Sequence, residues 1–221
     1  MSHLSISGLR PDVVLGNSQH LSQAAEKVGV ACVFCPSIVD LRSTKVTSTR
    51  TKVVLVNPIP ENRPSIMRSL AEKRPDIHCV LQESWPLSHE ARVLVDGYAA
   101  GCGNLEVRPR SDVGADIYAD ARFLLATYPS GRPRVVLEAQ SNGIPVIGLD
   151  QPALREAIGP GGTVLSPGLT DEQWAEEIAR LWDDSSYGDL AEAARLHSLR
   201  EEIQPDAVVS RVEDALRGVV R

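Results

Sequence analysis

The 221-residue chain has few aromatic side chains, no excess of positive charge and no long apolar run. Aromatic residues make up 4% of the sequence and hydrophobic residues 43%, so aliphatic side chains must form most of the core. The formal net charge is −6. This charge argues against nucleic acid as the main partner, because proteins that bind phosphate backbones usually present a basic face.

The sequence also lacks the segments that direct a protein into or across a membrane. No run of about 18 apolar residues occurs, so we expect no integral membrane segment. The first residues do not form a basic start followed by an apolar core, so we expect no signal peptide. A cytoplasmic location follows as the default expectation.

Cysteines are too few and too scattered for a zinc site of ordinary spacing. Cys32 and Cys35 are spaced as half of such a site, but Cys79 and Cys102 have no close cysteine or histidine partner. In a chain expected in the cytoplasm, four cysteines predict free thiols rather than disulfides. We therefore expect no metal site.

A polar stretch at residues 42–52 predicts a boundary between two parts of the chain. It contains one apolar residue among eleven and is rich in serine, threonine and positive charge, which is the composition of a linker. Residues 1–41 contain a predicted strand, helix and strand, a unit too small to be a domain alone. We interpret it as the remnant or tail of a larger N-terminal domain, followed by a second domain at 53–221.

After residue 52, short apolar runs alternate with amphipathic segments. The predicted strands lie at residues 53–56, 77–81, 105–107, 122–127, 146–149 and 162–165. The predicted helices lie at 65–73, 89–99, 116–121, 134–142 and 153–158. This alternation predicts an α/β fold, a Rossmann-like parallel sheet with helices on both faces.

The C-terminal part of the sequence is predicted to be helical. Thr170 and Gln173 form a capping box, in which a hydroxyl and an amide three residues later start a helix. The segment at about 190–221 is helical and charged. Its residues expected to face inward are Leu196, Leu199, Val208, Val212 and Leu216.

Several arginines fall on the loops where a ligand is expected. In open parallel sheets, ligands bind beyond the carboxyl ends of the strands. A planar guanidinium suits phosphate because it offers paired donors, so we favour an anion site, although surface arginines can fall on loops without binding anything. The arginines concerned are Arg63, Arg108, Arg110, Arg132 and Arg134.

Glu138 lies in the helix that follows the loop at 130–133. This loop is rich in backbone donors and positive charge. Such a loop before a helix N-terminus can hold an anion on backbone N–H groups. Glu138 has two interpretations that spacing leaves open. The helix dipole favours an acid near the helix start, or the carboxylate accepts both hydroxyls of a ribose. Gly143 is predicted to end the helix.

Residues from about 53 to 180 resemble the C-terminal, donor-binding domain of the family 4 glycosyltransferases. These are retaining enzymes with two Rossmann-like domains, the GT-B type. The family pattern is an acid, seven residues and Glu-Ala, followed by a Gly-x-Pro-Val turn and strand. Residues 130–139 align with the first part, with Glu138-Ala139 matching its end, and residues 142–147 match the turn and strand. Residues 150–167 match the next family segment.

Two further stretches extend this resemblance. Residues 53–63 resemble the opening strand and phosphate loop of the donor domain. Residues 12–40 resemble the last strands of the family's N-terminal domain, most of which is missing. The chain therefore looks like half of a GT-B fold.

The resemblance implies roles for individual residues. In the family the second acid binds the nucleotide ribose, which here is Glu138. The amides just before it approach the diphosphate, which here means Arg134, Val135 and Val136, and the base-binding loop maps near residues 108–111. The predicted donor-site residues are Asn57, Arg63, Arg108, Arg110, Ser130, Arg132, Arg134, Val135 and Glu138.

The sequence departs from the family pattern at several positions, and the loop before Arg134 lacks the usual glycine and aromatic residue. Ser130 replaces the first acid, which usually lies against the donor sugar. Pro58 and Asn62 replace the arginine and lysine of the phosphate loop, and Arg63 is one residue further on. We identify no catalytic residue.

Three functions remain open. The first is a glycosyltransferase that uses a nucleoside diphosphate sugar without a metal, with a partner chain or a homo-oligomer to complete the cleft. The second is a non-catalytic module that binds a nucleotide sugar or supports a partner enzyme. The third is a recruited enzyme that uses the same cleft for other chemistry.

Overall fold

The computed structural model describes residues 11–128 and 133–219 and divides the chain into two compact units. The larger unit spans residues 39–200, and the smaller unit combines the described parts of residues 1–38 and 201–221. The segment at 42–52 belongs to the larger unit, where Lys45 Nζ donates a 2.6 Å hydrogen bond to the Ser141 carbonyl. The division into domains at 1–41, 42–52 and 53–221 stays a prediction.

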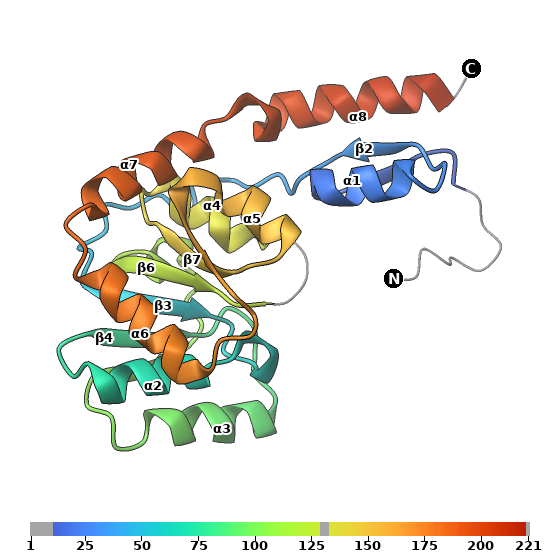
Figure 1. The fold of residues 1–221 in the computed structure, drawn as a ribbon. Coiled ribbons are helices and arrows are strands. Elements are labelled where there is room, and N and C mark those ends of the chain that lie inside the picture. The colour runs from blue at the N-terminus through green and yellow to red at the C-terminus, as the bar shows by residue number, and fades with distance from the viewer. Residues whose placement is uncertain (1–10, 129–132, 220–221) are drawn as a thin grey trace. The chain divides into compact units, whose positions relative to one another are not determined.

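The larger unit is built on a six-stranded parallel sheet with the order β5-β4-β3-β6-β7-β8 (Figure 1). Every strand pair in it is parallel, which confirms the predicted α/β class. The strands are β3 (Lys52–Val56), β4 (His78–Gln82), β5 (Leu105–Arg108), β6 (Ala121–Ala126), β7 (Val146–Leu149) and β8 (Gly162–Leu165).

Helices cover both faces of this sheet, with α2, α3 and α6 on one face and α4, α5 and α7 on the other (Figure 1). The sequence forms them because apolar residues recur at helical spacing and pack against the strands. The bounds are α2 (Ser65–Lys73), α3 (His89–Ala99), α4 (Arg134–Ser141), α5 (Pro152–Ile158), α6 (Asp171–Trp182) and α7 (Tyr187–Ser198).

Most of the core is aliphatic, as the composition predicts. Val53 and Val54 are fully buried although they point to opposite faces of β3, which is the expected pattern for a central strand covered on both sides. Met67 of α2 and Trp174 of α6 are also fully buried. The sheet is therefore held between two apolar layers, and its carboxyl edge is a fixed support for the loops.

The ends of two helices confirm sequence predictions. At the start of α6, Thr170 N donates to Gln173 Oε1 at 2.9 Å and Gln173 N donates to Thr170 Oγ1 at 3.3 Å, which is the predicted capping box. At the end of α4, Gly143 has a φ of +65° and donates to the Gln140 carbonyl, while Ile144 N donates to the Ala139 carbonyl. This arrangement is a Schellman motif and fixes the turn into β7.

Two predictions about helices are wrong. The helix predicted at 116–121 is a 3₁₀ turn at Gly114–Ile117, because Ala121 instead pairs with Lys52 at the start of β6. Three leucines predicted to face inward are instead exposed, with exposed fractions of 54%, 57% and 50% in chain order. Of the two valines predicted to face inward, Val208 is buried and Val212 is half-buried. Those leucines are Leu196, Leu199 and Leu216.

Within its described residues, the smaller unit contains a two-stranded parallel sheet, two helices and a 3₁₀ turn. Its elements are β1 (Val14–Gly16), α1 (Gln19–Glu26), β2 (Cys32–Phe34), the turn η4 (Glu201–Ile203) and α8 (Pro205–Val219). The predicted N-cap Ser18 accepts a hydrogen bond from Leu21 N at 3.3 Å. Arg211 Nη1 of α8 donates to the Phe34 carbonyl at 2.8 Å, which joins the two ends of the sequence within this unit.

Among the described helices, none has both the length and the apolar character that a membrane span requires.

Candidate functional site

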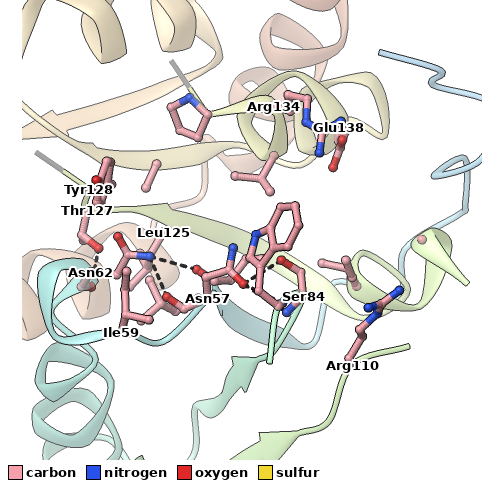
Figure 2. Close-up of a pocket in the computed structure, with 18 of the residues that line it drawn as sticks. Asn57, Ile59, Asn62, Ser84, Arg110, Leu125, Thr127, Tyr128, Arg134 and Glu138 are labelled. Carbon is pink, nitrogen blue, oxygen red and sulfur yellow. Dashed lines mark hydrogen bonds between the residues drawn. The ribbon is translucent and has the colours of Figure 1, made fainter. Parts of the chain in front are cut away.

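A cavity of about 760 Å³ lies at the carboxyl edge of the six-stranded sheet. Its lining comes from the ends of β3 and β6, the loops after β3, β4, β5 and β6, and the first turns of α4 (Figure 2). This is the position where ligands bind in open parallel sheets. The fold therefore brings together loops that are far apart in the sequence.

The structure places five of the nine predicted donor-site residues in the lining of this cavity. They are Asn57, Arg110, Arg134, Val135 and Glu138. Figure 2 shows that they approach from different sides, with Arg134 and Glu138 on one wall and Asn57 and Arg110 on the other. Ser130 and Arg132 lie outside the described residues.

The guanidinium of Arg63 is directed at α6, and Arg63 does not line the cavity. Its Nε donates to Asp171 Oδ1 at 3.0 Å and its Nη2 donates to the Leu169 carbonyl at 3.0 Å. Asp171 also accepts from Ser65 Oγ. The loop after β3 is thus tied to the start of α6 by a carboxylate that engages this arginine on two nitrogens.

Arg108 is likewise engaged by acids and does not line the cavity. It donates to Glu106 and, through Nη2, to Asp120 Oδ2 at 2.9 Å. Burial opposes ionisation of Asp120, but hydrogen bonds from Arg108 and Lys52 outweigh it and lower the pKa of Asp120. Two cations, Lys52 and Arg108, and two acids, Glu106 and Asp120, thus form one ion-pair network at β3, β5 and β6.

Glu138 meets a partner that the sequence did not indicate. The hydroxyl of Tyr118 donates to Glu138 Oε2 at 2.5 Å. Tyr118 is fully buried, and burial together with the nearby carboxylate raises the pKa of Tyr118 well above its ordinary value. The hydroxyl therefore stays protonated and donates, and it fixes one oxygen of Glu138. Little in the sequence indicated this contact, beyond the presence of a tyrosine in a chain with few aromatic residues.

The first turn of α4 offers backbone donors to the cavity. The N-cap is Pro133, which has no N–H, and no side-chain cap is found there among the described residues. Val136 N donates to the Pro133 carbonyl at 3.2 Å. The amides of Arg134 and Val135 lie ahead of it in the turn, where α-helices leave their N–H groups without intrahelical partners. Such a turn suits an anion.

On the side that faces the cavity, the loop after β3 is held by amide side chains. Asn57 has a φ of +55°, and its Oδ1 accepts from Ser84 N, Ser84 Oγ and Trp85 N at 3.1, 2.7 and 3.2 Å. Asn62 Nδ2 donates to the Asn57 carbonyl at 2.6 Å, and Thr127 Oγ1 donates to the Asn62 carbonyl at 2.5 Å (Figure 2). This side of the cavity is therefore fixed by neutral hydrogen bonds.

Within residues 11–128 and 133–219, no group of three or more histidine, cysteine, aspartate or glutamate side chains is arranged to hold a metal ion. The expectation that the donor site uses no metal stays a prediction.

Comparisons with known proteins identify a family. Residues 73–184, slightly more than half of the chain, match the family model described as glycosyl transferases group 1. The matched region runs from the end of α2 to the end of α6, and it includes α4 with Glu138. No curated protein sequence matches the chain.

Solved structures share the fold at low sequence identity. Anabaena Alr3699/HepE, crystallised with UDP and glucose, has a TM-score of 0.77 and 16% identity over 93% of this chain and 63% of its own. A glycosyltransferase from Rickettsia africae ESF-5 has a TM-score of 0.77 and 13% identity over 95% and 64%. The pneumococcal O-GlcNAc transferase GtfA, crystallised with UDP and GlcNAc, has a TM-score of 0.74 and 14% identity over 95% and 46%.

This chain spans less than two thirds of the length of each of these structures. At such identities the likeness establishes the architecture, which is the Rossmann-like type of the GT-B glycosyltransferases. Together with the match to the family model, it shows that the chain belongs to the group 1 glycosyltransferases.

Proposed function

We propose that the cavity is the donor site of a glycosyltransferase and binds a nucleoside diphosphate sugar. One observation carries this proposal. Glu138, fixed by Tyr118, lies beside an α4 N-terminus that has no side-chain cap among the described residues, and both face one cavity. A carboxylate that accepts from a diol and amides that donate to phosphate are the two halves of a nucleotide site.

The spacing along α4 allows one ligand to reach both groups. Glu138 follows Arg134 by four residues, slightly more than one helical turn and about 6 Å of axial rise. A ribose at Glu138 would therefore place its 5′-phosphates near the amides of Arg134 and Val135. Membership of a glycosyltransferase family and the fold shared with UDP-bound structures support this assignment.

The same wall would also stabilise the leaving group. When the glycosidic bond of the donor breaks, the electron pair goes to the diphosphate oxygen. Amide donors and a guanidinium fixed in place before the reaction stabilise such a developing charge without reorganisation. Arg134 is exposed at the start of α4 and lines the cavity, so we assign it this role.

We further propose that the chain is a donor-binding domain of a retaining, family 4 enzyme. Sugar transfer also needs an acceptor site and exclusion of water. Since the chain spans less than two thirds of the similar structures, we propose that a partner chain or a second copy completes the cleft. One of the similar structures is itself a complex, named GtfA/B.

A non-catalytic nucleotide-sugar-binding module is the second candidate, and one observation favours it. The positions of the family's phosphate-loop arginine and lysine hold Pro58 and Asn62, and the Asn62 amide donates to the Val56 and Asn57 carbonyls. Arg63, the nearest cation, is paired with Asp171. Among the described residues, the loop after β3 thus offers no unpaired cation to a diphosphate.

Isothermal calorimetry with UDP, GDP, ADP and their sugars tests the donor site. The expected result is micromolar to millimolar binding of at least one nucleotide, lost in Glu138→Ala and reduced in Glu138→Gln. Glu176→Ala, an exposed acid on α6, is the matched control and should bind as the wild type does. A folded wild-type protein that binds none of these nucleotides would overturn the proposal.

Turnover separates the two candidate functions. Hydrolysis or transfer of the sugar from the bound donor is measured with the protein alone and with candidate partner chains. Transfer supports the glycosyltransferase. Nucleotide-sugar binding without hydrolysis or transfer under either condition supports the non-catalytic module.

A further inference from the structure

Trp85 is an exposed aromatic residue in the wall of the cavity. Its exposed fraction is 60%, whereas Trp174 is fully buried and Trp182 is half-buried. A single exposed hydrophobic side chain is common on protein surfaces and does not by itself indicate a ligand. A second observation is that a side chain from another loop holds the backbone of Trp85.

Asn57 holds the Trp85 backbone from a left-handed conformation. At φ +55°, a residue with a Cβ is in a sparsely populated region, although asparagine tolerates it better than most. In this conformation Asn57 Oδ1 accepts from Ser84 N and Trp85 N. It also accepts from Ser84 Oγ (Figure 2). The side chain of Asn57, which directly follows β3, thus fixes the turn that contains Trp85.

A second amide joins the loop of Trp85 to the next loop. Gln82 is fully buried, and its Nε2 donates to the Glu83 carbonyl at 2.8 Å and to the Pro109 carbonyl at 3.0 Å. Pro109 directly precedes Arg110, which also lines the cavity. The loops after β4 and β5 are therefore locked together, with one aromatic and one cationic side chain at the same cavity.

We propose that Trp85 is the stacking platform for the nucleobase of the donor nucleotide. This inference rests on the proposed donor site. Glu138 follows β6 and Trp85 follows β4, two strands away in the order β4-β3-β6. Neighbouring strands are about 4.8 Å apart, so the two loops are separated by roughly 10 Å.

A separation of roughly 10 Å between the two loops leaves room for the nucleobase next to a ribose bound at Glu138. With the ribose at Glu138 and the diphosphate at the first turn of α4, the group that extends toward the β4 loop is the base. An indole face stacks on any base, because every base has a π-face. Trp85 therefore supplies affinity, and Arg110 lies on the adjacent loop, within reach of the base edge or its carbonyl oxygens.

Calorimetry with UDP and with ribose 5-diphosphate, which has no base, tests this assignment. Trp85→Ala is expected to weaken UDP binding by about tenfold or more, the usual effect of removing a base-stacking aromatic. It should leave ribose 5-diphosphate binding within about twofold. Trp85→Phe should retain most of the UDP affinity, and Val93→Ala, which removes an exposed apolar side chain on α3, is the matched control.

Tryptophan fluorescence gives an independent readout. UDP should quench the emission of the wild-type protein, and the quenching should disappear in Trp85→Phe, because neither remaining tryptophan lines the cavity. Asn57→Gly keeps the left-handed backbone and removes the three accepted hydrogen bonds. It should reduce both the quenching and the UDP affinity.

Several results would overturn the assignment. Unchanged UDP affinity in Trp85→Ala contradicts stacking, and an equal loss for UDP and ribose 5-diphosphate places the effect on the sugar or phosphates. A larger loss for UDP-glucose than for UDP assigns the indole to the hexose instead. If Glu138→Ala abolishes UDP binding and Trp85→Ala does not alter it, only this inference fails. If the wild-type protein binds no nucleotide, both this inference and the proposed donor site are contradicted.

Discussion

The hydroxyl of Tyr118 donates a 2.5 Å hydrogen bond to Oε2 of Glu138. Tyr118 lies between the 3₁₀ turn at Gly114–Ile117 and β6, and Glu138 lies on α4. Because the tyrosine is fully buried, its position is set by packing rather than by the carboxylate. The tyrosine therefore acts as a positioning residue that orients Glu138 toward the cavity.

Removing this hydroxyl should weaken nucleotide binding less than removing the carboxylate does. Tyr118→Phe leaves Glu138 free to rotate, so we expect UDP affinity to fall several-fold, while Glu138→Ala abolishes binding. The ratio of UDP to 2′-deoxy-UDP affinity should fall toward one in Tyr118→Phe, because an unfixed carboxylate discriminates the diol poorly. Calorimetry with both nucleotides measures this. A ratio equal to that of the wild type would exclude a positioning role.

Alkaline pH should destabilise the protein through the same tyrosine. The pKa of Tyr118 is raised in the folded state, so above the ordinary tyrosine pKa of about 10 the unfolded chain loses a proton that the folded chain keeps. The free energy of unfolding must then fall as pH rises above about 10. Urea unfolding between pH 8 and pH 11 measures this slope.

Tyr118→Phe is the control for the alkaline slope and should make it shallower. Some dependence should remain, because burial also raises the pKa of Tyr187. Identical slopes for the wild type and the variant would show that Tyr118 ionises as freely in the folded state as in the unfolded one.

The contact between Arg63 and Asp171 should stabilise the larger unit. It joins the loop after β3 to the first turn of α6, and both side chains are about three-quarters buried, with exposed fractions of 26% and 25%. In a double-mutant cycle with Arg63→Ala and Asp171→Ala, we expect a coupling energy of about 1–3 kcal/mol. Urea unfolding of the four proteins measures it, and additive effects would contradict the contact.

A UDP titration of the same Arg63→Ala protein tests the prediction that Arg63 is a donor-site residue. Unchanged affinity would indicate that Asp171 retains the guanidinium when nucleotide is bound. A clear loss of affinity would indicate that Arg63 leaves Asp171 for the diphosphate. Glu176→Ala again serves as a control for loss of a single exposed charge.

Arg122 should matter for stability and not for binding. Its guanidinium lies 3.9 Å from the ring centroid of Tyr187 and 5.1 Å from that of Trp182, and its Nη2 donates to the Trp182 carbonyl at 3.1 Å. These contacts join the start of β6 to the end of α6. Arg122→Ala should cost about 1–3 kcal/mol of unfolding free energy, from the lost cation–π contacts and hydrogen bond.

Arg122→Lys is the informative companion variant. It keeps the charge but not the planar stacking group, so we expect a loss close to that of the alanine variant. Nucleotide affinity should not change in either variant, because Arg122 is at the amino end of β6 and the cavity is at the carboxyl edge. A lysine variant as stable as the wild type would indicate that charge alone is sufficient.

The fold could be predicted from the sequence because its signals are local. The apolar run at 53–56, the capping box at Thr170 and Gln173, and the glycine at 143 each act over a few residues. The position of Glu138 in the cavity follows from the rule that parallel strands end at one edge.

The parts that could not be predicted depend on contacts between distant residues. Tyr118 and Glu138 are 20 residues apart and Arg63 and Asp171 are 108 apart, and neither spacing follows a helix or strand period. The same reason explains the exposed leucines Leu196, Leu199 and Leu216, in and after α7 and in α8. Helical periodicity places Leu196 on a face, but it does not indicate whether another element covers that face.

The neutral amides at the carboxyl edge have a consequence for the rate of binding. Asn57, Asn62 and Gln82 join the loops after β3, β4 and β5 to each other and to β6 before any ligand arrives. The entropy of ordering these loops is thus lost during folding rather than on association. A nucleotide should therefore meet a surface already in its final form, and its association rate should be limited by encounter rather than by rearrangement of these loops.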